Sequence, residues 1–343
     1  LSGMLSGNDR RSENNKHIAQ ETFLDRTWRQ ESQMNDQVHI QNLSAMLSLN
    51  YQFNEKHSWG MRYNFDRSPK HHDEINMQTN VAQDNVPYEK SSSTGWQSHE
   101  SSGHTVNTYY NGQVGDWHID FNADGIWQDN RIPQEMLEEI LPTDGERKEQ
   151  TVTSESLDKN TLYAAKLVAE HPLGKGNFSL GGEYTYTNRL NNYRNVEGIL
   201  EDDESRIREN SFALFAEYAF HIRQLQVRAG VRYEHLASDY FEEDKRIDEQ
   251  SRTYNNVFPS ISLSLPVGKA QLQLSYTGSI YRPSYWMLRS NATYINRYTY
   301  EGGNPLLRPS VINRLSFNAS YKWLYFNTRY IHGRDAILQL SQA

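Results

Sequence analysis

The strongest constraint on this chain is an alternation of apolar and polar residues with a period of two. In the segment LQVRAGVRYE, residues 225–234, the apolar residues Leu225, Val227 and Val231 alternate with the polar residues Gln226 and Arg228. Successive side chains of a β-strand point to opposite faces, so this segment has one apolar and one polar face. A helix would scatter the charged residues into its apolar stripe. The pattern therefore predicts an all-β fold.

The alternation allows about twelve strands to be placed along the chain. Each expected strand is more than ten residues long, whereas strands of soluble proteins centre near five or six residues. About 9–11 tilted residues are enough to cross a bilayer, so these lengths favour membrane-spanning strands. The expected strands are residues 41–53, 57–67, 104–114, 116–127, 159–170, 177–189, 207–221, 224–240, 253–265, 269–282, 309–322 and 324–334.

Short and long connections alternate between these strands. The short links include NEK at 54–56, GD at 115–116 and VGK at 267–269, and the long links are polar. Every second connection of an up-and-down barrel lies on the same rim, and outer-membrane barrels carry short periplasmic turns on one rim and long extracellular loops on the other. A soluble sandwich, with its polar face outside, has no reason to sort its connections in this way. We therefore expect an antiparallel, up-and-down transmembrane β-barrel.

Aromatic residues occur near both ends of the expected strands. Tyrosine and tryptophan are enriched at the two interfaces of a membrane, so two belts of rings support the barrel. Ordinary aromatics in a soluble core are the alternative. The residues near the short turns are Phe53, Trp59, Trp117, Phe178 and Phe220, and those near the long connections are Phe65, Trp127, Tyr186 and Tyr240.

The two ends of the chain read as parts of further strands. Residues 1–7, LSGMLSG, look like the end of one strand, and DAILQLSQA, residues 335–343, looks like the beginning of another. An open sheet of about 12–14 strands would leave backbone groups unpaired in lipid, at several kcal/mol each. We therefore expect residues 1–343 to be a single barrel segment, incomplete at both ends, of a larger barrel.

Composition and the lack of motifs exclude several classes of protein. No run of 18 apolar residues is present, which excludes a transmembrane helix and a signal-peptide core. Cysteine is absent, so no disulfide or thiolate metal site can form. The net charge of −8 and the lack of a basic stripe argue against a nucleic-acid partner. No phosphate-binding loop, nucleophile elbow or HExxH motif occurs, so we expect no enzyme and no cofactor.

The stretch from Ser279 to Pro309 contains the most unusual connection. Arg282 and Pro283 end an alternating strand, since proline cannot donate a ladder hydrogen bond. A dense aromatic and arginine segment follows, and Gly302-Gly303-Asn304-Pro305 forms a turn. We expect an extracellular loop with its own packing, and direct contact with a ligand is the alternative.

Residues 212–337 resemble the barrel of Gram-negative TonB-dependent receptors, in particular the outer membrane protein beta-barrel family. The resemblance rests on an ordered series of elements at familiar spacings, which together are more specific than any one alone. The elements are FALFAEYAF, VRAGVRYEH, NNVFPSISLSLPV, LSYTGSIYRPSYWML and GNPLLRPSVINRLSFNASY.

The resemblance implies a bacterial outer-membrane barrel of 22 strands closed around a plug domain, which imports scarce ligands with energy delivered through TonB. This chain differs from the full pattern because it lacks the plug, the TonB-contacting box and a terminal strand with an aromatic end. The implied partners are outer-membrane lipid and the TonB complex, the latter reached through a plug domain absent from this chain. The implied ligand is a small solute, chelate, peptide or glycan.

Two sets of side chains are candidates for ligand passage. Aromatic rings stack on sugars or aromatic chelators, and guanidinium groups bind carboxylates or phosphates. We therefore select as ligand-binding candidates Tyr285, Trp286, Arg289, Tyr294, Arg297, Tyr298 and Tyr300. Charged side chains on the polar faces of strands would line the lumen or hold a plug. This lumen-lining set is Arg62, Asp120, Asp124, Glu183, Arg228, Arg232 and Glu234.

A metal-capturing loop is a weaker hypothesis. His71, His72, Asp73 and Glu74 are adjacent in the sequence, and imidazole and carboxylate groups are ligands of zinc or copper. Adjacent histidines in a strand face opposite ways, however, so a solvated polar loop is the favoured interpretation. The acidic runs EDDESR and FEEDKRIDEQ lack the spacing of a calcium loop and are interpreted as solvated loop tips.

The sequence thus leads to a receptor barrel for TonB-dependent uptake of a scarce solute. The alternative is a structural or adhesive outer-membrane barrel that binds a partner through its long loops. The identity of the ligand, the oligomeric state, any lipoprotein partner and the total number of strands stay open.

Overall fold

The computed structural model describes residues 1–23, 26–285, 287–288, 292–296 and 299–338. Within these residues the regular structure consists of β-strands, which form one fifteen-stranded sheet and one small hairpin. No helix long and apolar enough to cross a membrane is found among the described residues. The predicted all-β fold is confirmed.

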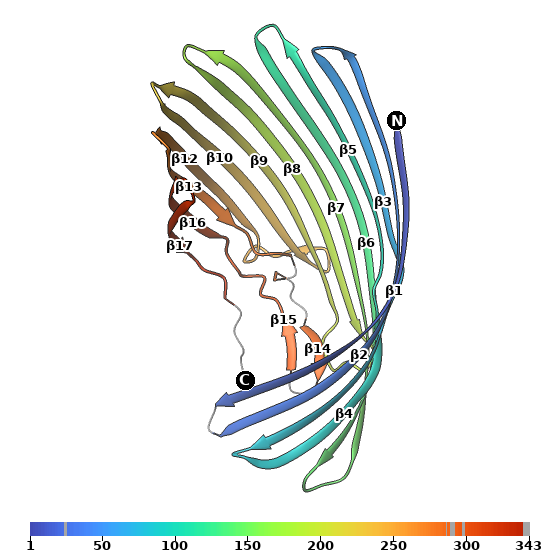
Figure 1. The fold of residues 1–343 in the computed structure, drawn as a ribbon. Helices are drawn as coiled ribbons and strands as arrows, with labels where there is room; N and C mark the ends of the chain where they lie inside the picture. Colours follow the sequence, from blue (N-terminus) through green and yellow to red (C-terminus); the bar gives the residue numbers. More distant parts are fainter. Residues whose placement is uncertain (24–25, 286, 289–291, 297–298, 339–343) are drawn as a thin grey trace.

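The large sheet is an antiparallel up-and-down meander (Figure 1). Its path runs β1-β2-β3-β4-β6-β7-β8-β9-β10-β12-β13-β16-β17, with β5 between β3 and β6 and β11 beside β10. The strands of the first half are β1 (Ser2–Phe23), β2 (Thr27–Asn54), β3 (His57–Gln83), β4 (Val86–Ser98), β5 (Glu100–Val114), β6 (Trp117–Pro142), β7 (Lys148–Leu173) and β8 (Gly176–Asn195). The remaining strands are β9 (Asp203–Ile222), β10 (Leu225–Glu242), β11 (Lys245–Arg246), β12 (Arg252–Val267), β13 (Ala270–Tyr281), β14 (Ala292–Asn296), β15 (Thr299–Gly302), β16 (Ser310–Tyr321) and β17 (Leu324–Arg334).

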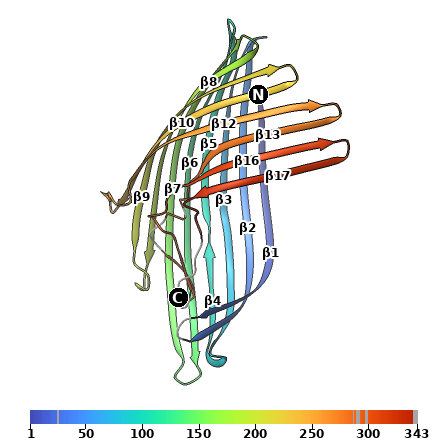
Figure 2. The same cartoon turned by 90° about the vertical axis from the view of Figure 1, so that its left-hand side faces the viewer.

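The sheet is strongly curved and forms a trough, as two perpendicular views show (Figures 1 and 2). Adjacent strands of the sheet form long antiparallel ladders, and the β6–β7 ladder, for example, runs from the pair His118–Glu170 to Ile140–Lys148. In the described part of the chain, β1 and β17 each have one neighbour in the sheet. The predicted antiparallel order of strands is therefore confirmed.

Two-residue turns connect the strands at one rim, as the sequence predicts. Five of these turns contain a residue with a φ of 51–61°. Glycine adopts this left-handed conformation without steric cost, and three of the five residues are Gly115, Gly174 and Gly268. The other two are Arg223 and Lys322. Tight turns of this kind fix the pairing register of the adjacent strands.

The opposite rim differs from the expectation of long irregular loops. The strand expected at 57–67 continues to Gln83, turns at 84–85 and returns as β4, and β6 and β7 extend in the same way to a tip at 143–147. No strand was expected in residues 8–40, but β1 and β2 pair there in an unbroken register. The prediction of loops was wrong here. Both faces of these extensions are polar or mixed, so their sequence shows no alternation, but the continuing backbone ladder satisfies their hydrogen bonds and keeps them as strands.

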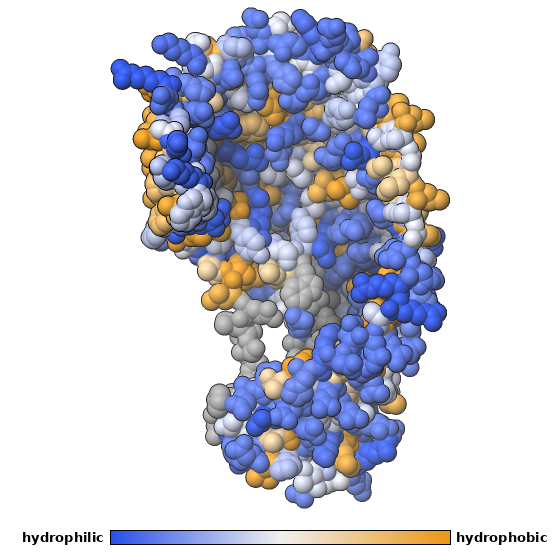
Figure 3. All heavy atoms as spheres, viewed as in Figure 1, coloured by the Kyte–Doolittle hydropathy of each residue, from blue (hydrophilic) through white to orange (hydrophobic). Residues whose placement is uncertain are grey.

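The two faces of the sheet differ in polarity. Leu47, Leu167, Leu214, Val231 and Leu274 lie on the convex face, and each is 40–53% exposed. The polar partners of these residues in the alternation lie on the concave face, where Figure 3 shows mostly hydrophilic side chains lining the hollow. An exposed apolar exterior around a hydrophilic interior is the arrangement of a membrane barrel rather than of a soluble sandwich.

Two aromatic rows border the apolar band of the convex face. The row near the long hairpins includes Trp127, whose indole N–H donates to the Tyr163 hydroxyl at 3.2 Å, and Tyr186, which stacks on Tyr163 with ring centroids 6.2 Å apart. The row near the short turns includes Trp117, which lies ten residues before Trp127 on β6. Ten tilted residues cover about 25 Å of height, which matches the apolar band of outer-membrane barrels.

The segment after β13 lies on the concave side of the sheet, with the β14–β15 hairpin inside the trough (Figure 1). It was expected to be an extracellular loop with its own packing. Part of that expectation is met, because the Asn304 N–H donates to the Met287 carbonyl at 2.6 Å. The segment also contacts the sheet itself, and these contacts define the candidate site.

Candidate lumenal binding site

The lumen-lining candidates lie on the concave face. Cross-strand register places Arg62 opposite Asn107, and Asn107 opposite Asp124, so these side chains share one face. Glu183 and Glu234 both lie opposite Ala213 of β9, which places them on one face as well. Arg282, which follows β13 into the trough, forms an ion pair with Glu234, and this contact identifies that face as the concave one.

A network of charged groups crosses β8 and β10 on the concave face. The Arg232 guanidinium lies 3.3 Å from a Glu183 carboxylate oxygen and 3.4 Å from a Glu234 oxygen. Glu234 is buried and also pairs with Arg282. The Arg232 guanidinium lies over the Phe215 ring, 5.8 Å from its centroid. Burial of a charge requires a partner, and the two arginines supply it for the carboxylate of Glu234.

The remaining lumen-lining candidates have polar partners on neighbouring strands. Asp124 accepts a hydrogen bond from the Asn107 side-chain amide at 2.7 Å, and Asp120 accepts one from Asn111. Arg228 lies 3.4 Å from a carboxylate oxygen of Glu217. Arg62 is exposed on the concave face.

Tyr285 anchors the connection between β13 and β16, called the lumenal segment below, to the sheet. Its hydroxyl donates to a Glu209 carboxylate oxygen of β9 at 2.7 Å, and the Arg189 guanidinium of β8 lies over its ring at 5.3 Å. Burial raises the pKa of the Tyr285 phenol well above its ordinary value, and the negative charge of Glu209 raises it further. Tyr285 therefore remains a protonated hydrogen-bond donor throughout the physiological range.

Tyr294 provides a second anchor about halfway along the lumenal segment. This residue of β14 is 2% exposed, and its hydroxyl donates to the carboxylate of Glu138, which is 1% exposed. Glu138 belongs to the extension of β6 beyond the aromatic row, between the buried residues Met136 and Ile140. The Tyr294–Glu138 contact is therefore buried beside apolar side chains of β6.

The other five predicted ligand residues cannot be placed in the same detail. Trp286, Arg289, Arg297 and Tyr298 lie outside the described residues, and Tyr300 belongs to β15. The structure thus brings two members of the predicted set, Tyr285 and Tyr294, to carboxylates of the concave face.

The predicted metal candidates do not converge on one point. His71 lies beside His99 with ring centroids 4.8 Å apart, whereas His72 stacks near Trp96 at 5.7 Å. The two histidines thus face opposite sides of β3, as strand geometry requires. Over the part of the chain that the structure describes, no three His, Cys, Asp or Glu side chains are arranged to hold a metal ion.

Sequence reasoning missed the carboxylates that receive the lumenal segment. Glu138 lies in the alternating stretch EMLEEIL, with Met136 and Ile140 on its own side, and this pattern could have placed it on an inward face. Glu209 lies at the edge of an expected strand, where nothing distinguished it from other charged residues. The arrangement presents carboxylates, guanidinium groups and phenols on the concave face, groups whose chemistry suits hydrogen bonds and ion pairs with a polar solute.

The comparisons with known proteins agree with this fold. The model of the outer membrane protein beta-barrel family matches residues 113–343. No curated protein sequence matches the chain significantly.

Solved structures of outer-membrane receptors share the fold. The alcaligin outer membrane receptor FauA from Bordetella pertussis has a TM-score of 0.52 at 10% identity, over 97% of this chain and 50% of that chain. The copper transporter OprC has a TM-score of 0.52 at 10% identity, over 98% and 54%. The ferric-catecholate import receptor Fiu from E. coli K12 has a TM-score of 0.52 at 9% identity, over 96% and 57%.

The present chain spans about half the length of these structures. The family match covers about two thirds of the 343 residues and includes the concave-face network, the lumenal segment and the strands that hold them. This chain belongs to the outer membrane protein beta-barrel family, and its place is the bacterial outer membrane.

Proposed function

We propose that residues 1–343 act as one barrel segment of a receptor for TonB-dependent uptake of a scarce solute. The observation that carries this proposal is the lumenal segment held at Glu138, Glu209 and Glu234, because it puts polar and aromatic groups across the path of a solute. The similarity of fold to the alcaligin receptor, the ferric-catecholate import receptor and the copper transporter supports the same class of function.

The ligand class follows from the chemistry of the concave face. Phenol rings, carboxylates and guanidinium groups suit a polar solute or a chelate with several hydrogen-bonding groups. A chelate, a peptide or a glycan could all make such contacts. The partners in this proposal are outer-membrane lipid around the convex face and the TonB complex, reached through a plug domain outside these 343 residues.

Uptake by cells tests the proposal. A strain lacking the gene should lose growth on one limiting nutrient from a panel of ferric chelates, copper, peptides and oligosaccharides, and loss of TonB should give the same phenotype. The purified complete protein should bind that same nutrient, measured by isothermal titration calorimetry. Normal uptake of the whole panel by the deletion strain would contradict transport.

A structural or adhesive barrel is the second candidate. The long hairpins favour it, because β6 and β7 extend about fifteen residues beyond Trp127 and present polar tips outside the membrane. Shortening the tip at 143–147 would reduce adhesion in that case and would leave nutrient uptake unchanged.

A further inference from the structure

Glu138 of β6 is a buried carboxylate with one oxygen left unpaired. The residue is 1% exposed, and its Oε2 atom accepts the hydrogen bond from the Tyr294 hydroxyl. Within the described residues, the other oxygen, Oε1, has no hydrogen-bond partner. Buried polar groups are normally satisfied, and leaving one unpaired is costly. The contact with Tyr294 therefore uses only part of the hydrogen-bonding capacity of this carboxylate.

Ser93 of β4 adds a second unpaired oxygen at the same place. Ser93 and Glu138 are direct partners in the β4–β6 ladder, so their side chains lie on one face with Cβ atoms about 4.5–5.5 Å apart. Ser93 is 3% exposed, and its hydroxyl has no hydrogen-bond partner among the residues that the structure describes. Two neighbouring buried oxygens are thus able to accept hydrogen bonds.

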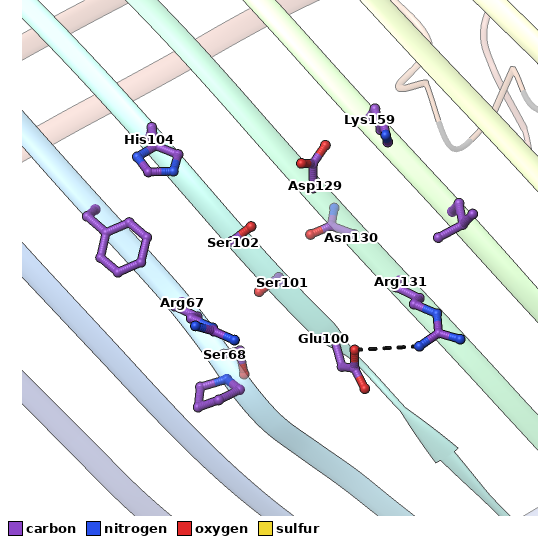
Figure 4. Close-up of a pocket in the computed structure, with 13 residues that line it drawn as sticks. Arg67, Ser68, Glu100, Ser101, Ser102, His104, Asp129, Asn130, Arg131 and Lys159 are labelled. Atoms are coloured by element: carbon purple, nitrogen blue, oxygen red, sulfur yellow. Dashed lines mark ion pairs between the residues drawn. The ribbon is translucent and has the colours of Figure 1, made fainter.

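A polar hollow on the opposite face of the sheet provides a comparison. Its lining includes Glu100 of β5 and Arg131 of β6, whose charged groups lie 3.9 Å apart (Figure 4). Arg131 and Glu138 are seven residues apart on β6, so they lie on opposite faces. Both side chains of the hollow are about half exposed, so water can satisfy whatever the pair leaves unmet. Glu138 and Ser93 are buried, and their unpaired oxygens remain able to accept a hydrogen bond from a solute.

Buried apolar side chains lie beside these oxygens on the same face. Met136 and Ile140 are two residues before and after Glu138 on β6, and Met77 of β3 is the direct partner of Ser93. Each of the three is 3–4% exposed. Apolar side chains around a few placed polar groups are typical of small-molecule sites, and thioethers contact aromatic rings favourably. The place suits a flat ring with a hydroxyl group at its edge, such as the phenol of the lumenal segment.

The lumenal segment reaches the concave face through donors of the kind that a polar solute would use. The Tyr285 hydroxyl donates to Glu209 at 2.7 Å, and the Arg282 guanidinium pairs with the buried carboxylate of Glu234. Both acceptors lie on the concave face, as Glu138 does. A solute that enters the lumen therefore competes with the segment for the same carboxylates.

We propose that the lumenal segment is an internal occupant of a solute site, and that Tyr294 is displaced from Glu138 by an aromatic ring with two adjacent free hydroxyl groups. This inference rests on the proposed function, because it names the class of solute. The phenol of Tyr294 satisfies one oxygen of Glu138. An aromatic diol donates to both oxygens of Glu138, or to one of them and to Ser93, so the exchange gains one hydrogen bond. A metal-bound catecholate has no protons to donate, so the site takes the metal-free diol.

Catechol is the probe, and ligand-observed NMR measures its binding to the complete protein in detergent. Tyr294→Phe keeps the ring of the internal occupant but removes its hydroxyl. This variant should bind catechol about tenfold more tightly than the wild type, because a hydrogen bond to a charged group corresponds to roughly a tenfold factor or more. A residue that only contacted the solute would show the opposite sign. Adding Glu138→Leu to Tyr294→Phe should abolish the binding. The control Tyr281→Phe removes the hydroxyl of an exposed tyrosine at the end of β13 and should bind catechol like the wild type.

Two further probes need only wild-type protein, so they decide the question even if a variant fails to fold. Veratrole, the dimethyl ether of catechol, has the same ring without a hydrogen-bond donor. In the ferric complex of catechol, the metal has replaced the hydroxyl protons. Neither probe should displace catechol from the wild type.

Three results would overturn the proposal. The first is binding of catechol by Tyr294→Phe that is equal to or weaker than binding by the wild type. The second is displacement of catechol by veratrole or by the ferric complex, and the third is no binding of catechol to either protein. The titration needs neither cells nor TonB, so it can fail while the uptake phenotype of the proposed function is observed, and the reverse outcome is equally distinct.

Discussion

The orientation of the sheet can be tested at two adjacent residues of β13. Leu274 and Gln273 lie at the same depth but on opposite faces. Leu274 is 40% exposed and lies between Leu263 and Phe317, whereas Gln273 lies between Ser264 and Asn318. Changing each residue to arginine adds the same charged group at the same height, so only the face differs.

The expected magnitude follows from the depth of Leu274. It lies four residues from the pair Ala270–Tyr321 at the short-turn rim, which corresponds to about 10 Å along the membrane normal. This position is close to the middle of an apolar band of about 25 Å, where arginine costs about 2–4 kcal/mol. Leu274→Arg should therefore lower the free energy of unfolding by about 3 kcal/mol, a change of roughly 150-fold in the folding equilibrium. Gln273→Arg should change it by less than about 1 kcal/mol, since the lumen is wet.

The measurement is reversible unfolding of the complete protein in lipid vesicles by guanidinium chloride, followed by tryptophan fluorescence. If both variants lost the same stability, or if Gln273→Arg lost more, the convex face would not face hydrocarbon. The assignment of a lumen to the concave face would then fail as well.

Three further predictions concern the lumenal segment and the long hairpins. Tyr285→Phe removes the hydrogen bond to Glu209 and should speed hydrogen exchange of the Met287 and Leu288 amides about tenfold or more, because a bond to a charged group contributes about 1.5–3 kcal/mol. Unchanged exchange would contradict the anchor. The pKa of His99 lies below its ordinary value of 6.5, first because of burial and second because of His71, so the folded state binds fewer protons and stability should fall as the pH drops below about 6.5. His99→Gln should flatten this dependence in thermal unfolding between pH 7 and pH 5, and an equal slope in both proteins would show that other groups cause it. Gly95→Ala should loosen β4 from β6, because a Cβ at this position would clash with the Glu135 carbonyl oxygen. In the control Gly103→Ala, the nearest atoms lie 3.9 Å from the added Cβ, so this variant should have little effect. Limited proteolysis at the 84–85 tip distinguishes the two variants, and equal cleavage of both would refute the clash.

The transmembrane part of the fold could be predicted from sequence because lipid on one side and water on the other impose a strict alternation. That alternation is clear in β10 and β13, where the predicted faces agree with the structure. Beyond Trp127 the same constraint disappears, since both faces meet water or protein, and the extensions were therefore interpreted as loops. Their strand structure depends on pairing with neighbours, such as Thr79 with Ser91, which single-residue patterns do not encode.

The candidate site was predictable only in part for a related reason. Tyr285 and Tyr294 could be selected by residue type and position in an unusual segment. Their acceptors could not, because Tyr294 and Glu138 are 156 residues apart in the chain. A contact over such a separation depends on the curvature of the whole sheet, which brings β6 and β14 to one side of the trough.

The extended hairpins also affect how the mouth of this barrel behaves mechanically. β2, β3, β4, β6 and β7 form one continuous hydrogen-bonded sheet past the membrane, so their tips resist independent bending in a way that irregular loops would not. A molecule that reaches this rim would therefore meet backbone held in a fixed shape rather than loops that fold around it.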